Sequence, residues 1–202
     1  GVQTCALPIY AKGITKKGYP TQDGLHAADI TFTNVEVGAD AAIGDPENGL
    51  PLIERVADEA RIALCAEAVG AMDQSLKDTV EYIKTRKQFG RPLAAFQLIQ
   101  AQIAEVAGNL AASAGMMLQV DALRQEGRME MMHAAMAKAT STRLARSSAA
   151  LARDALGGNG LLTEHEIAKI MGDVEAIYSY EGSYGMNTLI VGRALTGVSA
   201  FV

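Results

Sequence analysis

The chain has 202 residues, 49% of them hydrophobic and 20% charged, with a formal net charge of −5 and an isoelectric point near 5.2. This is the composition of an ordinary globular protein with a sizeable core, and its negative charge offers no attraction to nucleic acid or to an anionic membrane. No apolar run reaches the roughly 18 residues of a membrane span, and the start carries no signal-peptide pattern, so we expect a cytoplasmic protein.

The first nine residues, GVQTCALPI, lack an initiator Met and resemble the translation of a sequencing-library adapter. We therefore expect residues 1–9 to be a leader outside the fold, with an ordinary disordered terminus as the alternative. Without them a single cysteine is left, Cys65, in Ala-rich apolar surroundings. This setting indicates a small core residue, not a disulfide or a metal ligand.

Residues 10–47 are expected to form short strands. The segment ADITFTNVEV places apolar residues in near alternation, and turn signals occur at GYP, QDG and GDPENG. Alternation interrupted by such turns is typical of strands. We therefore read residues 10–47 as the end of a β-region.

From Asn48 onward the period of the apolar residues becomes helical. They recur every seven positions at Ile62, Val69, Leu76 and Ile83. This stripe predicts an amphipathic helix of about 35 residues, which FGRPL ends. Further stripes predict helices from Ile99 to Val120, from about Met129 to Leu156 before LGGNG, and from Met186 to Val198 after a shorter helical piece. Long antiparallel helices with short connections predict a mostly α fold, a four-helix bundle preceded by strands.

Such a bundle raises the alternative of a carboxylate-bridged di-iron site. That site needs two Glu-x-x-His pairs and two further Glu residues, but the chain has one such pair, Glu130 and His133. A solvated pair near a helix start is the better interpretation, and no metal site is expected. The sequence also lacks a G-x-S-x-G motif and a phosphate-binding P-loop, which argues against a hydrolase or a nucleoside triphosphatase.

Three stretches closely resemble the acyl-CoA dehydrogenase family, in the family's order and at suitable separations. They are TRKQFGRPLAAFQ at residues 85–97, DALGGNG at residues 154–160 and YEGSYGMNTLIVGR at residues 180–193. The resemblance extends over residues 10–202 and is nearest to glutaryl-CoA and other dicarboxylyl-CoA dehydrogenases. It implies the end of a central β-domain at residues 10–47 and a C-terminal four-helix domain at residues 48–202. Because residues 14–50 are more similar to pimeloyl-type relatives, a chimera of two genes is a further alternative.

The resemblance implies flavin adenine dinucleotide (FAD) as the cofactor. A guanidinium fork, amide donors and glycine backbone suit its pyrophosphate. The positions that match the family's cofactor contacts are Arg86, Gln97, Asp154, Gly157, Gly158, Ser183 and Gly185. The family often has Gln in place of Asp154 and a polar pair in place of Tyr184 and Gly185, so this chain departs from the family there. On the residues alone, a solvated cation at a helix end is the alternative for Arg86.

Glu181 matches the family's catalytic base. Proton removal beside a thioester needs a positioned carboxylate and stabilisation of the developing enolate. In the family a Glu between Tyr and Gly takes the α-proton while the β-hydrogen leaves as hydride, so the resemblance places Tyr180 and Gly182 near the substrate. On the residues alone, a carboxylate favoured by a helix N-terminus is the alternative for Glu181.

The segment DEAR at residues 58–61 also matches positions near the substrate. The resemblance assigns Asp58 and Arg61 to that region, although a charged pair three apart on a helix is more often a surface pair. Some relatives place the base just before this arginine. Ala60 stands there in this chain, which favours Glu181.

The implied function is flavin-dependent α,β-dehydrogenation of an acyl-CoA thioester. The implied partners are an electron-transferring flavoprotein and further copies of the chain in a homo-oligomer, a dimer or tetramer, because the family binds part of its cofactor across a subunit interface. An acyl-CoA oxidase on the same fold and a non-catalytic helical interaction subunit are the alternatives. Since the N-terminal helices and most of the β-domain are absent, we expect the chain alone to be inactive, and its residues do not specify the acyl chain length.

Overall fold

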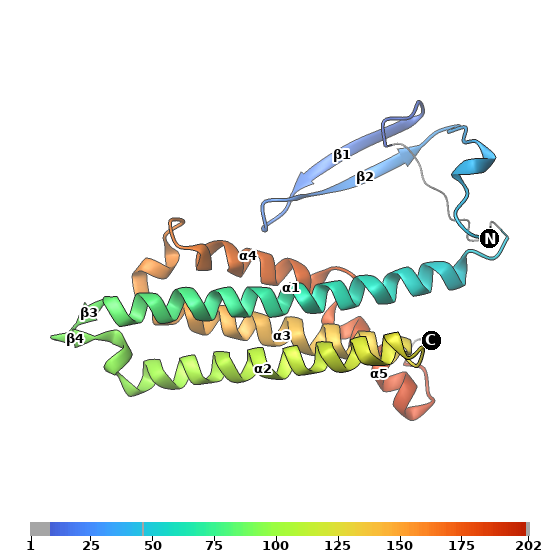
Figure 1. Ribbon diagram of the computed structural model, residues 1–202. Helices are drawn as coiled ribbons and strands as arrows, with labels where there is room; N and C mark the ends of the chain where they lie inside the picture. Colours follow the sequence, from blue (N-terminus) through green and yellow to red (C-terminus); the bar gives the residue numbers. More distant parts are fainter. Residues whose placement is uncertain (1–8, 46, 201–202) are drawn as a thin grey trace.

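The computed structural model describes residues 9–45 and 47–200. Within them, a β-hairpin is followed by a bundle of long helices (Figure 1). The expected leader lies outside the described residues except for Ile9, so that expectation stays a prediction. The domain boundary near residue 48 also stays a prediction, although the first long helix begins beside it, at Leu50.

The hairpin consists of β1 (Ile14–Pro20) and β2 (His26–Phe32), which pair antiparallel with Pro20 opposite His26. The prediction of a turn at GYP is wrong, because these residues end β1. A proline is tolerated at the end of a strand that has a free edge. The chain reverses at residues 21–25 instead, which confirms the turn signal at QDG: the Thr21 N–H donates to the Leu25 carbonyl at 2.9 Å.

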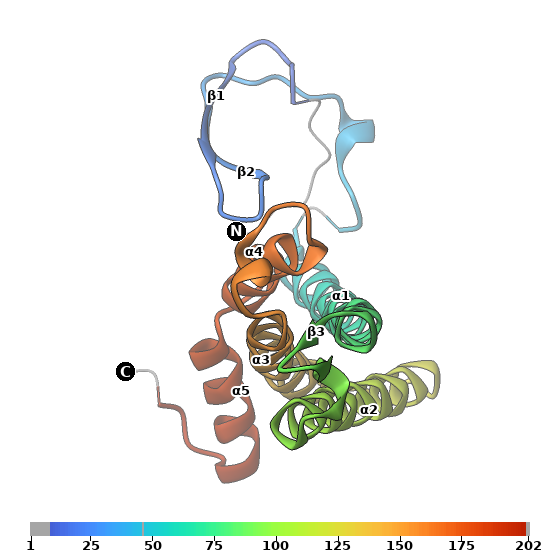
Figure 2. The ribbon, with the colours of Figure 1, turned by 90° about the vertical axis from the view of Figure 1, so that its left-hand side faces the viewer.

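The helices confirm the predicted α fold. Their bounds are α1 (Leu50–Thr85), α2 (Gln97–Gln125), α3 (Met131–Ala155), α4 (Glu166–Ser179) and α5 (Tyr184–Thr196). A small hairpin of β3 (Lys87–Gln88) and β4 (Arg91–Pro92) connects α1 to α2. Helices α1 to α4 form the four-helix bundle, and α5 packs outside it against α3 (Figure 2). None of the helices in the described part of the chain has the length and apolar character that crossing a membrane requires.

The core lies where α1, α3 and α4 meet. Its buried residues include Leu64, Ala68 and Met72 of α1, Ala145, Ala149 and Ala152 of α3, and Ile170, Val174 and Ile177 of α4. The small side chains of α3 let the neighbouring helix backbones approach closely, and the larger side chains of α1 and α4 fill the space between them. Cys65 is buried, which confirms the expectation of a core cysteine. The burial raises the pKa of its thiol.

The Glu130–His133 pair lies at the start of α3. The backbone N–H of Glu130 donates to Nδ1 of His133 at 3.0 Å, so the histidine caps the helix N-terminus. The interpretation as a helix-start feature is confirmed.

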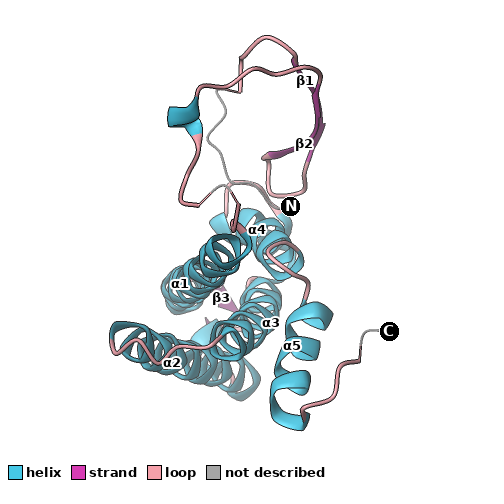
Figure 3. Cartoon of the chain, turned by 90° about the vertical axis from the view of Figure 1, so that its right-hand side faces the viewer, coloured by secondary structure: helices cyan, strands magenta, loops and turns pink. Residues whose placement is uncertain are grey.

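The β1–β2 hairpin stands over α4 and α1 on one side of the bundle (Figure 3). A two-stranded sheet with exposed faces gains little from burial, so its contact with α4 matters. At that contact the Gln22 carbonyl oxygen lies 2.9 Å from the position that a Cβ at Gly172 would occupy. A glycine is therefore needed in α4 where the hairpin turn touches the helix.

Candidate functional site

The structure separates the predicted site residues into two groups at opposite ends of α4. Glu181 follows the C-terminal end of α4. Arg86 and Gly157 line a pocket with Tyr82, whose ring contacts His165 at the start of α4. Helix α4 has 14 residues, which at 1.5 Å per residue is about 20 Å. The two groups therefore form two separate sites on this chain.

Glu181 lies in the connection between α4 and α5, in a left-handed backbone conformation. Its φ is 55°, and the φ of Gly182 is 80°. A non-glycine residue in this region costs on the order of 1 kcal/mol and persists when surrounding structure holds it. The glutamate is exposed and precedes the Ser183 cap of α5. It therefore extends from a strained turn outside the helix.

A buried lysine lies under this turn. Lys138 of α3 is completely covered, and its Nζ donates to the Gly182 carbonyl at 2.7 Å and to the Tyr178 carbonyl at 3.1 Å. Burial, together with the nearby Arg61 guanidinium, lowers the pKa of Lys138 to about 8, and the Glu181 carboxylate acts in the opposite direction. The ammonium thus joins two carbonyls on either side of Glu181.

Asn187 of α5 connects the same turn to α1. It is fully buried, and its Nδ2 donates to the Gly182 carbonyl at 2.6 Å and to the Ser183 carbonyl at 3.1 Å. Its Oδ1 accepts from Nε of Arg61 at 3.1 Å, and Arg61 also pairs with Asp58 at 2.6 Å. One hydrogen-bonded network therefore runs from α1 through α5 to the Glu181 turn.

This network corrects the interpretation of Asp58 and Arg61 as a surface pair. Their side chains are only 13% and 12% exposed, and Asn187 of α5 accepts a hydrogen bond from Arg61. Gly182 is required in the same place for two reasons. Its φ is positive, and a Cβ there would lie 3.0 Å from Nδ2 of Asn187.

Two tyrosines, one at each end of the connection between α4 and α5, stack on each other. Tyr178 and Tyr184 stack with ring centroids 5.6 Å apart and an interplanar angle of 13°. The guanidinium of Arg146 lies 4.3 Å from the Tyr178 centroid. This stack gives a structural reason for Tyr184, the residue that departs from the family pattern. Ser183 caps α5, since its Oγ accepts from the Met186 N–H at 3.3 Å.

At the other end of α4, a pocket of about 330 Å³ brings together four of the predicted cofactor residues. Its lining includes Arg86, Asp154, Gly157 and Gly158. A Cβ at either glycine would meet no heavy atom within 4 Å, so the described residues leave that backbone open to a ligand. Gln97, the first residue of α2, does not line this pocket.

The two charged residues of this pocket, Arg86 and Asp154, differ in whether their side chains have partners. No acidic side chain among residues 9–45 and 47–200 pairs with the Arg86 guanidinium. The Asp154 carboxylate, by contrast, accepts from Nε2 of Gln102 at 2.8 Å and lies 3.4 Å from an Arg153 nitrogen. Arg86 can therefore bind an anion from outside the described chain, whereas Asp154 would repel one.

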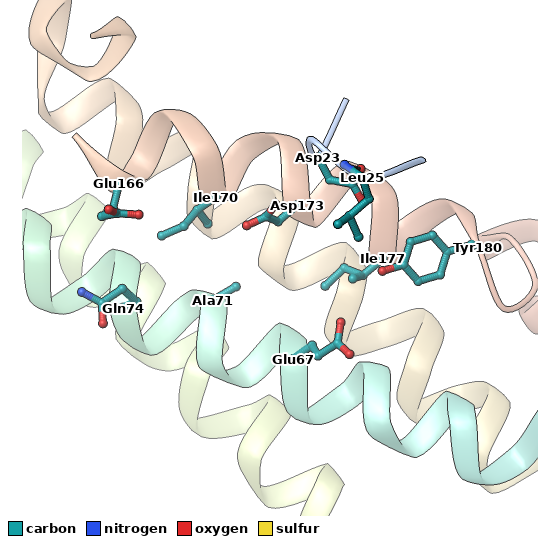
Figure 4. A pocket seen from close by; sticks show the side chains of 10 residues that line it. All are labelled: Asp23, Leu25, Glu67, Ala71, Gln74, Glu166, Ile170, Asp173, Ile177 and Tyr180. Carbon is teal, nitrogen blue, oxygen red and sulfur yellow. Dashed lines mark hydrogen bonds between the residues drawn. The ribbon is translucent and has the colours of Figure 1, made fainter. Parts of the chain in front are cut away.

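A second pocket, of about 370 Å³, lies between α1, α4 and the hairpin turn, on the side of Tyr180 (Figure 4). Its wall carries the carboxylates of Asp23, Glu67, Glu166 and Asp173. Burial, with the neighbouring Glu67 and Asp23 carboxylates, raises the pKa of the Tyr180 phenol. Four acidic side chains disfavour a phosphate group in this pocket.

The sequence analysis missed the two residues that hold the Glu181 turn. Lys138 is a lone charge in the Ala-rich stretch AAMAKAT, and Asn187 is an amide shortly before the apolar run LIV. Such isolated polar residues on buried helix faces are a usable signal, because a buried polar group needs a partner. The signal does not say which partner.

Comparison with known proteins agrees with this architecture. Residues 47–196 match the family described as "Acyl-CoA dehydrogenase, C-terminal domain". The short-chain-specific acyl-CoA dehydrogenase of Megasphaera elsdenii is 30% identical over 198 residues, which are 96% of this chain and 52% of that protein.

Two solved structures show the same fold. A glutaryl-CoA dehydrogenase from Mycobacterium smegmatis in complex with FADH2 superposes with a TM-score of 0.92 at 25% identity, over 100% of this chain and 53% of that one. The butyryl-CoA dehydrogenase of Megasphaera elsdenii superposes with a TM-score of 0.90 at 28% identity, over 96% and 52%. The chain thus spans about half the length of the curated relatives it matches.

Proposed function

Because this chain belongs to the acyl-CoA dehydrogenase family, we propose that it forms part of an FAD-dependent enzyme that introduces a double bond between the α and β carbons of an acyl-CoA thioester. The observation that carries the proposal is Glu181 in a strained turn, held from three helices by Lys138, Asn187 and Arg61. A strained backbone turn that surrounding structure holds in place is typical of a functional site.

In this function Glu181 is the base. Its carboxylate takes the α-proton, the electron pair of that C–H bond becomes the new π bond, and the β-hydrogen leaves as hydride. None of the described residues accepts a hydrogen bond from the Glu181 N–H, so this donor is available to the thioester oxygen, where charge develops. Bound FAD supplies the acceptor for the hydride.

The donor groups at the other end of α4 fit the FAD pyrophosphate. Arg86 provides an unengaged guanidinium, and Gly157 and Gly158 leave their backbone open to a ligand. Asp154 does not fit a diphosphate, and its carboxylate suits a hydroxyl donor such as a ribose instead. Gln97, Ser183 and Gly185 stay proposed cofactor contacts.

The separation of the two sites supports a homo-oligomer. A single FAD that used both sites of one chain would have to run along the whole of α4, about 20 Å. We therefore propose that Arg86, Gly157 and Gly158 would hold the diphosphate of a cofactor that serves the Glu181 site of another copy. The proposed partners are an acyl-CoA, an electron-transferring flavoprotein and further copies of this chain in a dimer or tetramer.

The test joins this chain behind the N-terminal half of the Megasphaera elsdenii short-chain enzyme, the part of that protein that this chain does not match. Addition of butyryl-CoA without oxygen should bleach the flavin absorbance, and Glu181→Gln should abolish bleaching while flavin stays bound. Rapid reoxidation of the reduced flavin by oxygen would identify an oxidase instead. Bleaching that survives in Glu181→Gln would exclude Glu181 as the base.

A further inference from the structure

We propose that Lys138 is a positioning residue that holds the Glu181 turn closed by donating from one ammonium to backbone carbonyls on both sides of the glutamate. The inference rests on the proposed function for the role of Glu181 as the base. The closure of the turn itself can be tested without flavin or substrate. Lys138 lies on α3, 43 positions before the glutamate in the chain.

The geometry of the two carbonyls carries the inference. Tyr178 lies three residues before Glu181 and Gly182 one residue after it, yet both carbonyls reach the same Nζ, at 3.1 and 2.7 Å. They can converge only because the chain turns back through the positive φ angles of Glu181 and Gly182. If these two bonds break, α3 no longer bonds to the backbone on either side of Glu181.

Both acceptor sites of the Gly182 carbonyl oxygen are occupied. It accepts from Nζ of Lys138 and from Nδ2 of Asn187, at 2.7 and 2.6 Å. A carbonyl oxygen has two lone pairs, so each donor has its own acceptor site and neither can replace the other. Lys138 is therefore a separate restraint on the turn from α3, beside the restraint from α5.

A purely structural role would not call for a lysine in this position. Its ammonium is fully buried, and the charged groups that act on it are Arg61 of α1, which is repulsive, and Glu181. Burying a charge is costly, and an apolar residue of similar length often leaves global stability unchanged. Replacing Lys138 with Met should therefore loosen the turn much more than it destabilises the whole protein.

The experiment uses the protease Glu-C, which cleaves after glutamate, on the 202-residue chain. Cleavage after Glu181 reports opening of the turn, and cleavage after Glu126, an exposed residue at the end of α2, reports the rest of the molecule. Mass spectrometry gives the two rates in one reaction. The quantity compared is the ratio of the rate after Glu181 to the rate after Glu126, in which differences in protease activity cancel.

Lys138→Met should raise this ratio at least about tenfold, because two charge-assisted hydrogen bonds are lost. Lys138→Arg, which keeps a cationic donor, should return it to within a few-fold of the original chain. The matched control is Lys77→Met, since Lys77 is exposed and pairs with Asp73 on the surface of α1. This control should leave the ratio unchanged.

The proposal is overturned if Lys138→Met leaves the ratio unchanged, including the case in which both bonds are cleaved faster by the same factor. It is also overturned if Lys138→Arg raises the ratio as much as Lys138→Met does. Since neither rate involves a thioester, such a failure would leave Glu181 as the base untouched. Conversely, flavin bleaching that survives in Glu181→Gln would refute the role of Glu181 as the base, and the closure of the turn by Lys138 would be unaffected.

Discussion

Asn187→Ala tests how strongly the turn is tied to the bundle. The side chain of Asn187 makes two bonds to carbonyls, at 2.6 and 3.1 Å, and accepts one from Arg61 at 3.1 Å. A neutral hydrogen bond contributes about 1 kcal/mol and a bond to a charged group about 1.5–3 kcal/mol. In this variant the Gly182 carbonyl still accepts from Nζ of Lys138, and the Ser183 carbonyl still accepts from the backbone N–H of residue 187. The expected loss in the free energy of unfolding is therefore about 3 kcal/mol.

Urea unfolding followed by helical circular dichroism measures this loss. The matched control is Asn109→Ala, because Asn109 is a half-buried asparagine that makes one side-chain bond within the described chain, to Ser148 at 3.2 Å. It should lose about 1 kcal/mol. If the two variants differ by less than about 1 kcal/mol, the network around Gly182 is not the restraint described above.

Three further predictions concern the hairpin contact, the buried ammonium and the cofactor pocket. Gly172→Ala should lower the free energy of unfolding by about 1–2 kcal/mol in the same urea experiment, because its Cβ would meet the Gln22 carbonyl oxygen at 2.9 Å. Gly70→Ala is the control. It should raise the free energy of unfolding by about 0.5–1 kcal/mol, because a Cβ there would meet open space. Lys138 has a folded pKa of about 8 against an ordinary 10.5, so between these values the unfolded state holds a proton that the folded state has lost. The free energy of unfolding of the original chain should therefore increase with pH over that window relative to Lys138→Met, and a decrease would contradict the assigned burial. Arg86→Lys should weaken FAD binding by the joined enzyme about tenfold in a fluorescence titration, because a point charge replaces the guanidinium fork, and unchanged affinity would remove Arg86 from the site.

The helices and the motif positions could be predicted from the sequence because both depend on local patterns. The seven-residue repeat of Ile62 to Ile83 predicted α1, and the observed helix spans Leu50–Thr85. The contacts around Glu181 could not be predicted, since they join residues distant in the chain. Lys138 bonds to a carbonyl 44 residues away, and Arg61 bonds to Asn187 across 126 residues.

The departures from the prediction have physical causes. GYP was expected to turn because Gly and Pro favour turns, but these residues pair within the hairpin, with Pro20 opposite His26. The predicted site residues lie in two groups because the motifs at Arg86 and Glu181 are separated by the length of α4. No local pattern in a sequence reports such a separation.

The most direct measurement of whether Glu181 is the base is exchange of the α-hydrogen. An acyl-CoA analogue with sulfur in place of its β-carbon keeps acidic α-hydrogens but has no β-hydride to transfer. In deuterium oxide, mass spectrometry of this analogue with the joined enzyme reports proton transfer alone. We expect rapid exchange, slowed about 10²- to 10⁴-fold in Glu181→Gln and unchanged in Lys77→Met. Exchange at the original rate in Glu181→Gln would show that another group removes the proton.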